Sequence, residues 1–249
     1  MSDDKSVIFD YPTDIRKLDY FDLFLKDIKN DFVEKTPKVR WSALQFGDKN
    51  AIDNIEYEDF PVPETEYKQL FLHGGTLNNS AAKDAATVEY NSEDGNSVAA
   101  FNLKFEKDTR LIGLPKAVLY MSCPDFDDMN VYVILRKLDK DGKPLMHLCF
   151  PIEATPVKSI AEIPEKQRQS TNLHMGSVGI LRASHRAFDE KKSIHSQFPL
   201  NPHEIEEKIK PGEIVKLEIG IWAMGNDFAA GESISVQVRL VPPTMPLPA

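Results

Sequence analysis

Short runs of alternating apolar and polar residues, separated by Gly, Pro, Asn and Asp, constrain the fold of this chain more than any other feature. Successive side chains of a strand point to opposite faces, so a period of two indicates a strand with one buried face. β-Branched and aromatic residues dominate these runs. About nine such strands with only one or two helices predict a mostly β fold, an antiparallel jelly-roll sandwich. The runs are residues 39–46, 68–75, 97–105, 117–123, 130–138, 146–152, 178–183, 213–222 and 233–241.

Residues 13–30 follow a different period. Leu18, Phe21, Phe24 and Leu25 recur at spacings of three and four residues, which predicts an amphipathic helix. An apolar stripe on a single helix needs a surface to cover it. We therefore expect Leu18, Phe21 and Leu25 to form a docking face, either on the sandwich or on another domain.

These patterns divide the chain into three parts. Residues 1–35 form an N-terminal helical segment, residues 36–241 form the sandwich, and residues 242–249 form a tail. The tail is rich in proline, which cannot donate to a β ladder, so we expect it to be disordered. Residues 158–175 break the β pattern and are expected to form a long polar excursion with about one helical turn.

The most specific local signal is the sequence LDKDGKPL. Asp141-Gly142 is typical of a hairpin turn with positive φ angles. We expect this turn to join the strand at 130–138 to the strand at 146–152 as an antiparallel hairpin.

Charge and composition exclude several classes of partner. The chain has 30 Lys and Arg against 39 Asp and Glu, a formal net charge of −9, with the basic residues scattered. This balance argues against a nucleic acid or an anionic membrane as partner. No apolar run approaches the ~20 residues that span a bilayer, and the first residues lack a signal-peptide pattern. We expect a cytoplasmic protein in which Cys123 and Cys149 are buried free thiols.

The segment GSVGILRASHRAFDE, residues 176–190, contains the residue types of an acyl-transfer triad. In a strand, Ser184 and His185 would point to opposite faces and could not form a nucleophile–base pair. The chain also has no G-x-S-x-G sequence to hold a nucleophilic serine. We therefore assign no catalytic residue.

Asp125, Asp127 and Asp128 form an acidic cluster before the strand at 130–138. Carboxylates could bind a hard cation there, but the loop lacks the glycine and distal glutamate of an EF-hand. The favoured alternative is an inter-strand loop whose carboxylates accept hydrogen bonds from backbone amides. The six histidines lack zinc-ligand spacing, and no glycine-rich phosphate loop opens a helix. We expect no metal and no cofactor.

Several blocks together resemble the C-terminal domain of X-Pro dipeptidyl-peptidases and of the related cocaine-esterase-like (CocE/NonD) acyl hydrolases. The resemblance runs from about Tyr20 to about Val238 and is specific as an ordered set. The blocks are TPKVRWSALQFGD, EDFPVPETEYKQLFL, MSCPDFDDMNVYVILRKLDKDG, GILRASHRAFDE and HEIEEKIKPGEIVKLEIGIWAMGNDFAAGESISVQV.

The resemblance implies a galactose-binding-like jelly roll that packs on a preceding α/β-hydrolase domain carrying a Ser-Asp-His triad. Residues 20–39 resemble the last helix of that domain, so the docking face at Leu18, Phe21 and Leu25 would contact a domain that this chain lacks. The family usually reads Asp-x-Asp before the long strand. This chain has Asp128 followed by Asn130, which weakens a polar role there.

Three functions remain open on the sequence. The chain could be the ancillary sandwich of a serine hydrolase acting on esters, amides or X-Pro peptides, a fragment or separate subunit that is inactive alone. In that case Arg182, His185, Arg186, Asp128 and Trp222 would line the substrate cleft, or be interface and surface salt-bridge residues. It could instead be a free-standing carbohydrate-binding module that uses its tryptophans, or an interaction protein whose helix docks on a partner or on a second copy.

Overall fold

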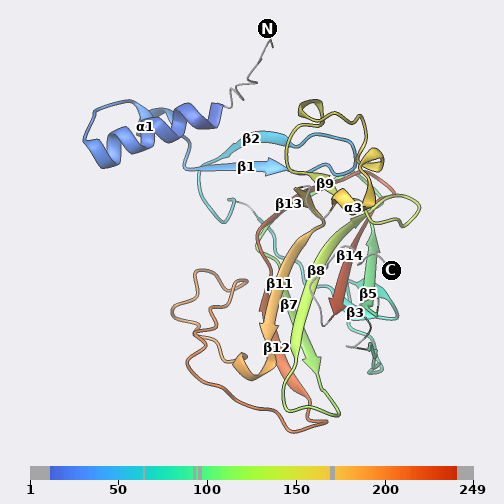
Figure 1. The fold of residues 1–249 in the computed structure, drawn as a ribbon. Coiled ribbons are helices and arrows are strands. Elements are labelled where there is room, and N and C mark those ends of the chain that lie inside the picture. Colours follow the sequence, from blue (N-terminus) through green and yellow to red (C-terminus); the bar gives the residue numbers. More distant parts are fainter. Residues whose placement is uncertain (1–11, 64, 92–93, 95–96, 169–171, 240–249) are drawn as a thin grey trace.

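The protein is mostly β, with strands in several sheets and few helices (Figure 1). The structure, a computed structural model, describes residues 12–239 apart from 64, 92–93, 95–96 and 169–171. The expected tail at 242–249 and the first eleven residues lie outside this range. The expectation of a β-rich sandwich is confirmed.

The larger layer is a six-stranded sheet in which distant parts of the sequence are neighbours. Its pairs are antiparallel except β4 with β5, which meet in parallel at Thr76 and Asn102. In spatial order its strands are β11 (Ser177–Arg182), β8 (Asn130–Leu138), β14 (Ser233–Arg239), β5 (Ala99–Lys104), β4 (Thr76–Asn78) and β3 (Phe71–His73).

The second layer consists of two antiparallel pairs that follow one another along the chain. These are β7 (Lys116–Met121) with β12 (Val215–Gly220), and β6 (Thr109–Gly113) with β13 (Met224–Phe228). The Ile221 amide donates to the Pro115 carbonyl at 2.9 Å, which continues the backbone pairing between them.

One apolar cluster lies between the layers. Val131, Val133 and Leu135 alternate along β8, and Leu217 and Ile219 alternate along β12. All five are buried members of the same cluster. Both layers therefore turn the apolar side of a period-two pattern inward, as the sequence predicts.

A β hairpin closes one end of the sandwich. β1 (Val39–Ala43) pairs with β2 (Ile52–Tyr57), and a register shift falls between Trp41 and Ala43. Beyond β1, Leu44 forms a parallel bridge with Asn226 of β13. This bridge fixes the hairpin to the second layer, and its geometry creates the pocket described below.

The excursion after β8 is held by a small core of its own. Leu148, Ile160 and Ile163 are buried there, with Leu173 packed beside them. The segment contains β9 (His147–Leu148), β10 (Leu173–His174), two 3-10 turns (Ile152–Ala154 and Ile160–Glu162) and α3 (Glu165–Arg168). It thus has more local helical structure than the single turn expected.

The predicted hairpin turn is confirmed, but the strand expected after it is wrong over most of its length. Gly142 has φ 82°, and the Asp139 amide donates to the Lys143 carbonyl at 2.9 Å. The returning strand β9 has two residues and pairs with β10 rather than with β8. The chain leaves the sheet because Pro144 and Pro151 flank this segment and remove backbone donors.

Among the described strands of five or more residues, three are absent from the sequence prediction: β2, β6 and β13. The short strands β4 and β10 were not predicted either. β2 is mostly exposed and rich in polar residues, β6 is short, and β13 reads MGNDF, with a glycine and two polar residues. None of these three carries an alternating apolar pattern. β2 pairs with β1, and β6 pairs with β13. These pairings, rather than a local apolar pattern, hold the three segments in strands.

The predicted helix ends earlier than residue 30. α1 spans Pro12–Lys26, because Asp27 takes a left-handed conformation with φ 54°. The Ile28 amide then donates to the Asp22 carbonyl at 2.9 Å, which closes the end of the helix. α1 packs on α2 (Phe32–Lys35) through the rings of Tyr20, Phe24 and Phe32. Figure 1 shows this helical pair standing clear of the sheets.

Candidate functional site

Asp128 is the centre of the polar cluster predicted near the end of β11. Its carboxylate accepts hydrogen bonds from the Arg182 Nε at 2.5 Å and from the Ser184 hydroxyl at 2.7 Å. It also accepts the backbone amides of Ser184 and Met129, each at 2.9 Å. The expectation that this loop uses carboxylates to bind backbone amides is confirmed for Asp128.

These contacts govern the ionisation of Asp128. Partial burial is the largest single influence and raises its pKa. The hydrogen bonds from Ser184, Arg182 and Met129 together outweigh burial and lower the pKa to about 2. Asp128 is therefore a carboxylate at neutral pH, fully engaged in tying the loop before β8 to the end of β11.

Ser184 lies in a turn just after β11 and not in an extended strand. β11 ends at Arg182, and Ala183–His185 forms a 3-10 turn. Ser184 is 1% exposed, and its hydroxyl is donated to Asp128. The predicted strand 178–183 therefore ends one residue early, and the Ser184 amide donates to the Asp128 carboxylate.

His185 and Arg186 have other partners. The His185 ring lies 5.3 Å from the ring of His203, and its buried Nδ1 has no hydrogen-bond partner. Arg186 donates to the Glu207 carbonyl at 2.7 Å and forms an ion pair with the Glu207 carboxylate at 3.1 Å. Arg182, His185 and Arg186 are thus neighbours in sequence that act in different local contacts.

Trp222 lies apart from that cluster. β12 ends at Gly220, so Trp222 follows the strand and the expectation of a strand up to residue 222 is wrong there. The Trp222 side chain is 72% exposed. Its backbone amide donates to the Val178 carbonyl at 3.2 Å, near the opposite end of β11 from Arg182. The five predicted cleft residues therefore do not form one site.

The predicted docking face of α1 is open to solvent. Leu18 is 63% exposed, Phe21 is 47% exposed and Leu25 is 72% exposed. The sandwich does not cover these side chains, and the first of the two expected outcomes, docking on the sandwich, is wrong for the described residues.

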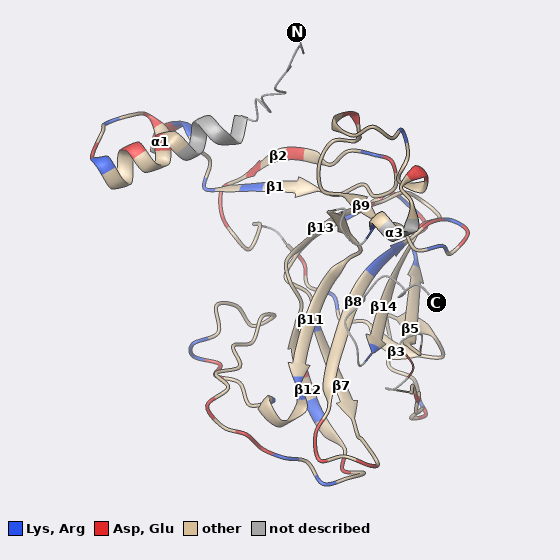
Figure 2. Cartoon of the chain, viewed as in Figure 1, with Lys and Arg blue, Asp and Glu red and all other residues tan. Residues whose placement is uncertain are grey.

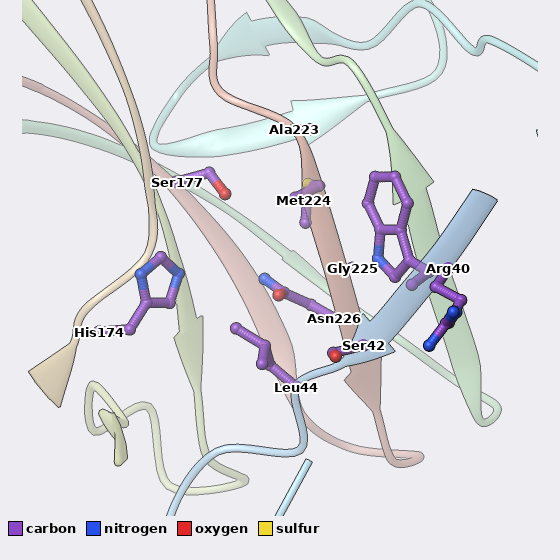
Figure 3. A pocket seen from close by; sticks show the side chains of 10 residues that line it. Arg40, Ser42, Leu44, His174, Ser177, Ala223, Met224, Gly225 and Asn226 are labelled. Atoms are coloured by element: carbon purple, nitrogen blue, oxygen red, sulfur yellow. The ribbon is translucent and has the colours of Figure 1, made fainter. Parts of the chain in front are cut away.

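A pocket that the sequence did not indicate lies where β1, β13 and the β10–β11 segment meet (Figure 3). Its volume is about 230 Å³. Asn226 is 1% exposed, and neither its Oδ1 nor its Nδ2 has a hydrogen-bond partner. Isolated strand patterns could not reveal this site, because its walls come from three separate parts of the chain. The lining residues are Arg40, Trp41, Ser42, Leu44, His174, Ser177, Ala223, Met224, Gly225 and Asn226.

The remaining features concern metals, thiols, charge and membranes. Within the described ranges, no group of three or more His, Cys, Asp or Glu side chains is arranged to hold a metal ion. Both thiols are free, but Cys149 is exposed and Cys123 is only partly buried, so the expectation of buried thiols is wrong. Basic and acidic residues are interspersed along the chain (Figure 2). Among the described helices, none has the length and apolar character of a membrane span.

Comparison with known proteins assigns the fold to a family. A family model, the X-Pro dipeptidyl-peptidase C-terminal non-catalytic domain, matches residues 30–239. The chain belongs to this family. In the X-Pro dipeptidyl-peptidase C-terminal family the domain is the non-catalytic part of a hydrolase, which implies a catalytic domain in the same chain of family members. The resemblance seen in the sequence is confirmed.

Solved structures agree with this assignment. Two structures of a CocE/NonD family hydrolase from Staphylococcus aureus are 30% identical to this chain, with TM-scores of 0.75 and 0.72. The matches span 94% and 93% of this chain and 39% of each of those chains. An aminopeptidase from the marine sediment archaeon Thaumarchaeota archaeon shares the fold, with 18% identity, a TM-score of 0.55, and coverage of 92% of this chain and 36% of its own. No curated protein matches the chain.

Proposed function

We propose that this chain is the ancillary β sandwich of a CocE/NonD-type serine hydrolase, that it packs on an α/β-hydrolase domain through α1, and that it cleaves no substrate alone. The observation that carries the proposal is the exposure of Leu18, Phe21 and Leu25 on a helix that stands clear of the sandwich. Each large apolar side chain gains ~1.5–3 kcal/mol when it is fully buried. An uncovered stripe of this kind favours a partner surface.

The occupant we assign to this face is the hydrolase domain rather than a second copy. The match spans 39% of the S. aureus hydrolase chain, so most of that protein lies outside the matched region. The family model describes the present domain as the non-catalytic, C-terminal one. α1 precedes the sandwich, on the side of the sequence where a catalytic domain would join.

The complete hydrolase would act by acyl transfer, on esters, amides or N-terminal X-Pro peptides. The hydrolase domain would supply a serine nucleophile, a histidine base and an oxyanion hole. The sandwich would stiffen that domain and form one wall beside it. Asp128, Arg182 and Arg186 hold loops of the sandwich in this scheme, and the exposed Trp222 is free to contact the hydrolase domain.

Inactivity of the chain alone is tested with a fluorophosphonate probe and with X-Pro-nitroanilide and nitrophenyl ester substrates. We expect no labelling or turnover above that of a Ser184→Ala variant, because the Ser184 hydroxyl is donated to Asp128. Serine labelling together with turnover that Ser184→Ala abolishes would contradict this part of the proposal.

Docking is tested by mixing the chain with the S. aureus hydrolase from which the matching segment has been removed. We expect co-elution in size-exclusion chromatography, and we expect Phe21→Asp with Leu25→Glu to abolish it. Ile194→Glu is the matched control, since Ile194 is 80% exposed on a loop far along the chain from α1. Light scattering of the chain alone tests the alternative occupant, a second copy. If the chain is a dimer and Phe21→Asp with Leu25→Glu makes it monomeric, the face is assigned to a second copy.

A further inference from the structure

The pocket around Asn226 has the features of a binding site that the proposed function does not use. Asn226 is 1% exposed, so its side-chain amide has lost nearly all contact with bulk water. Both polar atoms of that amide lack a partner. Burying an amide without hydrogen bonds is costly, and native proteins rarely leave one so.

The backbone groups next to Asn226 are already hydrogen-bonded, so the side-chain amide of Asn226 is the group available to bind a ligand. The Leu44 amide donates to the Gly225 carbonyl at 2.7 Å, and the Asp227 amide donates to the Leu44 carbonyl at 3.0 Å. These bonds fix the strand on which Asn226 sits. Figure 3 shows the Asn226 amide at the centre of the lining residues, directed toward the side on which His174 and Ser177 lie.

The volume of the pocket sets the size of the occupant. About 230 Å³ is several times the ~30 Å³ that one water molecule takes in the liquid. It is also smaller than the ~300–1,000 Å³ of sites for drug-sized ligands. The space fits a group of about the size of one amino-acid residue.

The chemistry of the walls selects among small ligands. The lining contains one cationic residue, Arg40, and no carboxylate. An amide side chain presents one acceptor and one donor side by side, and the matching partner presents a donor and an acceptor in the same way. A carboxylate would satisfy only the donor and would place an oxygen against the Asn226 carbonyl.

The apolar part of the lining disfavours a sugar. Leu44, Met224 and Ala223 line the pocket with Asn226, and they would desolvate the other hydroxyls of a sugar without bonding them. Burial lowers the pKa of His174, so its ring is neutral at pH 7 and attracts no anion. An amide with short alkyl substituents meets both the polar centre and the apolar walls.

We propose that the pocket formed by β1, β13 and the β10–β11 segment binds an uncharged carboxamide or peptide group, with Asn226 as the residue that pairs with it. The inference stands apart from docking on a hydrolase domain, because the pocket is complete in this chain. The source of the amide is either a small molecule or the end of a peptide.

The test uses the full chain, labelled with ¹⁵N, and N-acetylalaninamide as the probe. We expect saturable shifts of the Asn226 side-chain resonances and of residues that line the pocket. Acetate and methyl galactoside serve as the carboxylate and sugar probes. A blocked dipeptide amide compared with N-acetylalaninamide distinguishes a peptide end from a smaller amide.

Asn226→Leu is the decisive variant, because it keeps the branched shape of the side chain and removes the amide. We expect affinity for N-acetylalaninamide to fall by about tenfold or more, as when two neutral hydrogen bonds are lost. We also expect the unfolding midpoint to stay or rise, since an unpaired buried amide has been replaced by an apolar group. The matched control Asn102→Leu, at an exposed position of β5, keeps the affinity of the original chain.

Ala223→Phe provides a second route if Asn226→Leu does not fold. Ala223 lines the pocket on an exposed stretch, so a larger side chain there narrows the opening without touching Asn226. We expect binding of N-acetylalaninamide to be lost. Equal affinity in a folded Asn226→Leu or Ala223→Phe variant, preference for the sugar or acetate, or no probe bound at all would each overturn the proposal.

Discussion

Asp128 ties together two parts of the chain that sequence alone leaves unrelated. Its oxygens accept from Arg182 and from both donors of Ser184, residues more than fifty positions further along the chain. The sequence identified Asp128 and Arg182 as separate candidates for a cleft or an interface. Their contact required the pairing of β11 with β8, which sets Arg182 opposite Asn130.

Replacing Asp128 by Asn should destabilise the protein at neutral pH by about 1–2 kcal/mol, a value reduced because Arg182 is half exposed to solvent. The folded pKa of Asp128, about 2, lies below its ordinary value of 3.8. The stabilisation is therefore complete above about pH 4 and is lost as the pH falls through about 2. Urea unfolding of both proteins across that range measures it. A difference that does not shrink in acid would contradict the assignment.

Lys137 shows a second residue-scale constraint, a charge inside the fold. Its side chain is 3% exposed and forms an ion pair with Glu232 at 2.7 Å. The ammonium also donates to the carbonyls of Gln45 and Asp227, each at 2.7 Å. It thereby connects β8 to the segment after β1 and to β13. The sequence predicts a strand here but not a buried lysine.

Replacing Lys137 by Met should cost about 3–5 kcal/mol, because it leaves the Glu232 carboxylate without its cation. Chemical denaturation gives the free energy of unfolding. Lys143→Met, at an exposed turn position, should change it by less than about 0.5 kcal/mol. Adding Glu232→Gln to Lys137→Met should recover part of the loss, and a double variant that only adds the two losses would show that the pair is not coupled.

At the scale of elements, the contact of β1 with β13 depends on a glycine. A Cβ built on Gly225 would lie 1.6 Å from the Trp41 Nε1 and 2.8 Å from the Ser42 carbonyl oxygen. Trp41 in turn stacks on Phe60, with ring centroids 5.6 Å apart. Glycine at this position therefore lets the hairpin lie on the second layer.

Gly225→Ala should force Trp41 to move and should cost about 1–3 kcal/mol through overpacking. In a Trp222→Phe background Trp41 is the remaining one of the chain's two tryptophans, so its fluorescence reports the displacement directly. Trp41→Leu should relieve the clash and reduce the cost of Gly225→Ala. An unchanged emission spectrum and an unchanged unfolding midpoint would show that the hairpin does not rest on this contact.

The predictability of the elements follows from burial. β8 was predicted with its bounds because its alternation is long and strongly apolar. β13 was missed because Gly225, Asn226 and Asp227 interrupt any apolar period. The candidate pocket was missed for the same reason, since polar residues of an unrecognised strand give no signal of where they point.

At the scale of the whole molecule, α1 and α2 are an appendage of the sandwich. Their ring contacts are with each other, and the apolar stripe of α1 is exposed. The buried residues of the main core begin later in the chain, with Leu77. The sandwich should therefore not depend on these helices for its stability.

Removing residues 1–35 should leave the midpoint of thermal unfolding unchanged, because little apolar surface of the core is uncovered. Binding of a hydrophobic dye should decrease, because the exposed stripe is gone. Calorimetry and dye fluorescence of the two chains give both quantities. A lower midpoint in the shortened chain would mean that the helices pack on the sandwich in solution.

The sequence by itself determined which residues of β8 and β12 face inward and which residues of α1 form an apolar stripe. Side-chain direction repeats every two residues in a strand and every 3.6 in a helix, so a local pattern is sufficient. Only the tertiary structure decided that β8 lies between β11 and β14, that Asp128 meets Ser184, and that Asn226 closes a pocket. Strands pair through backbone groups that every residue shares, so the identity of a neighbouring strand is set by the packing of the whole core.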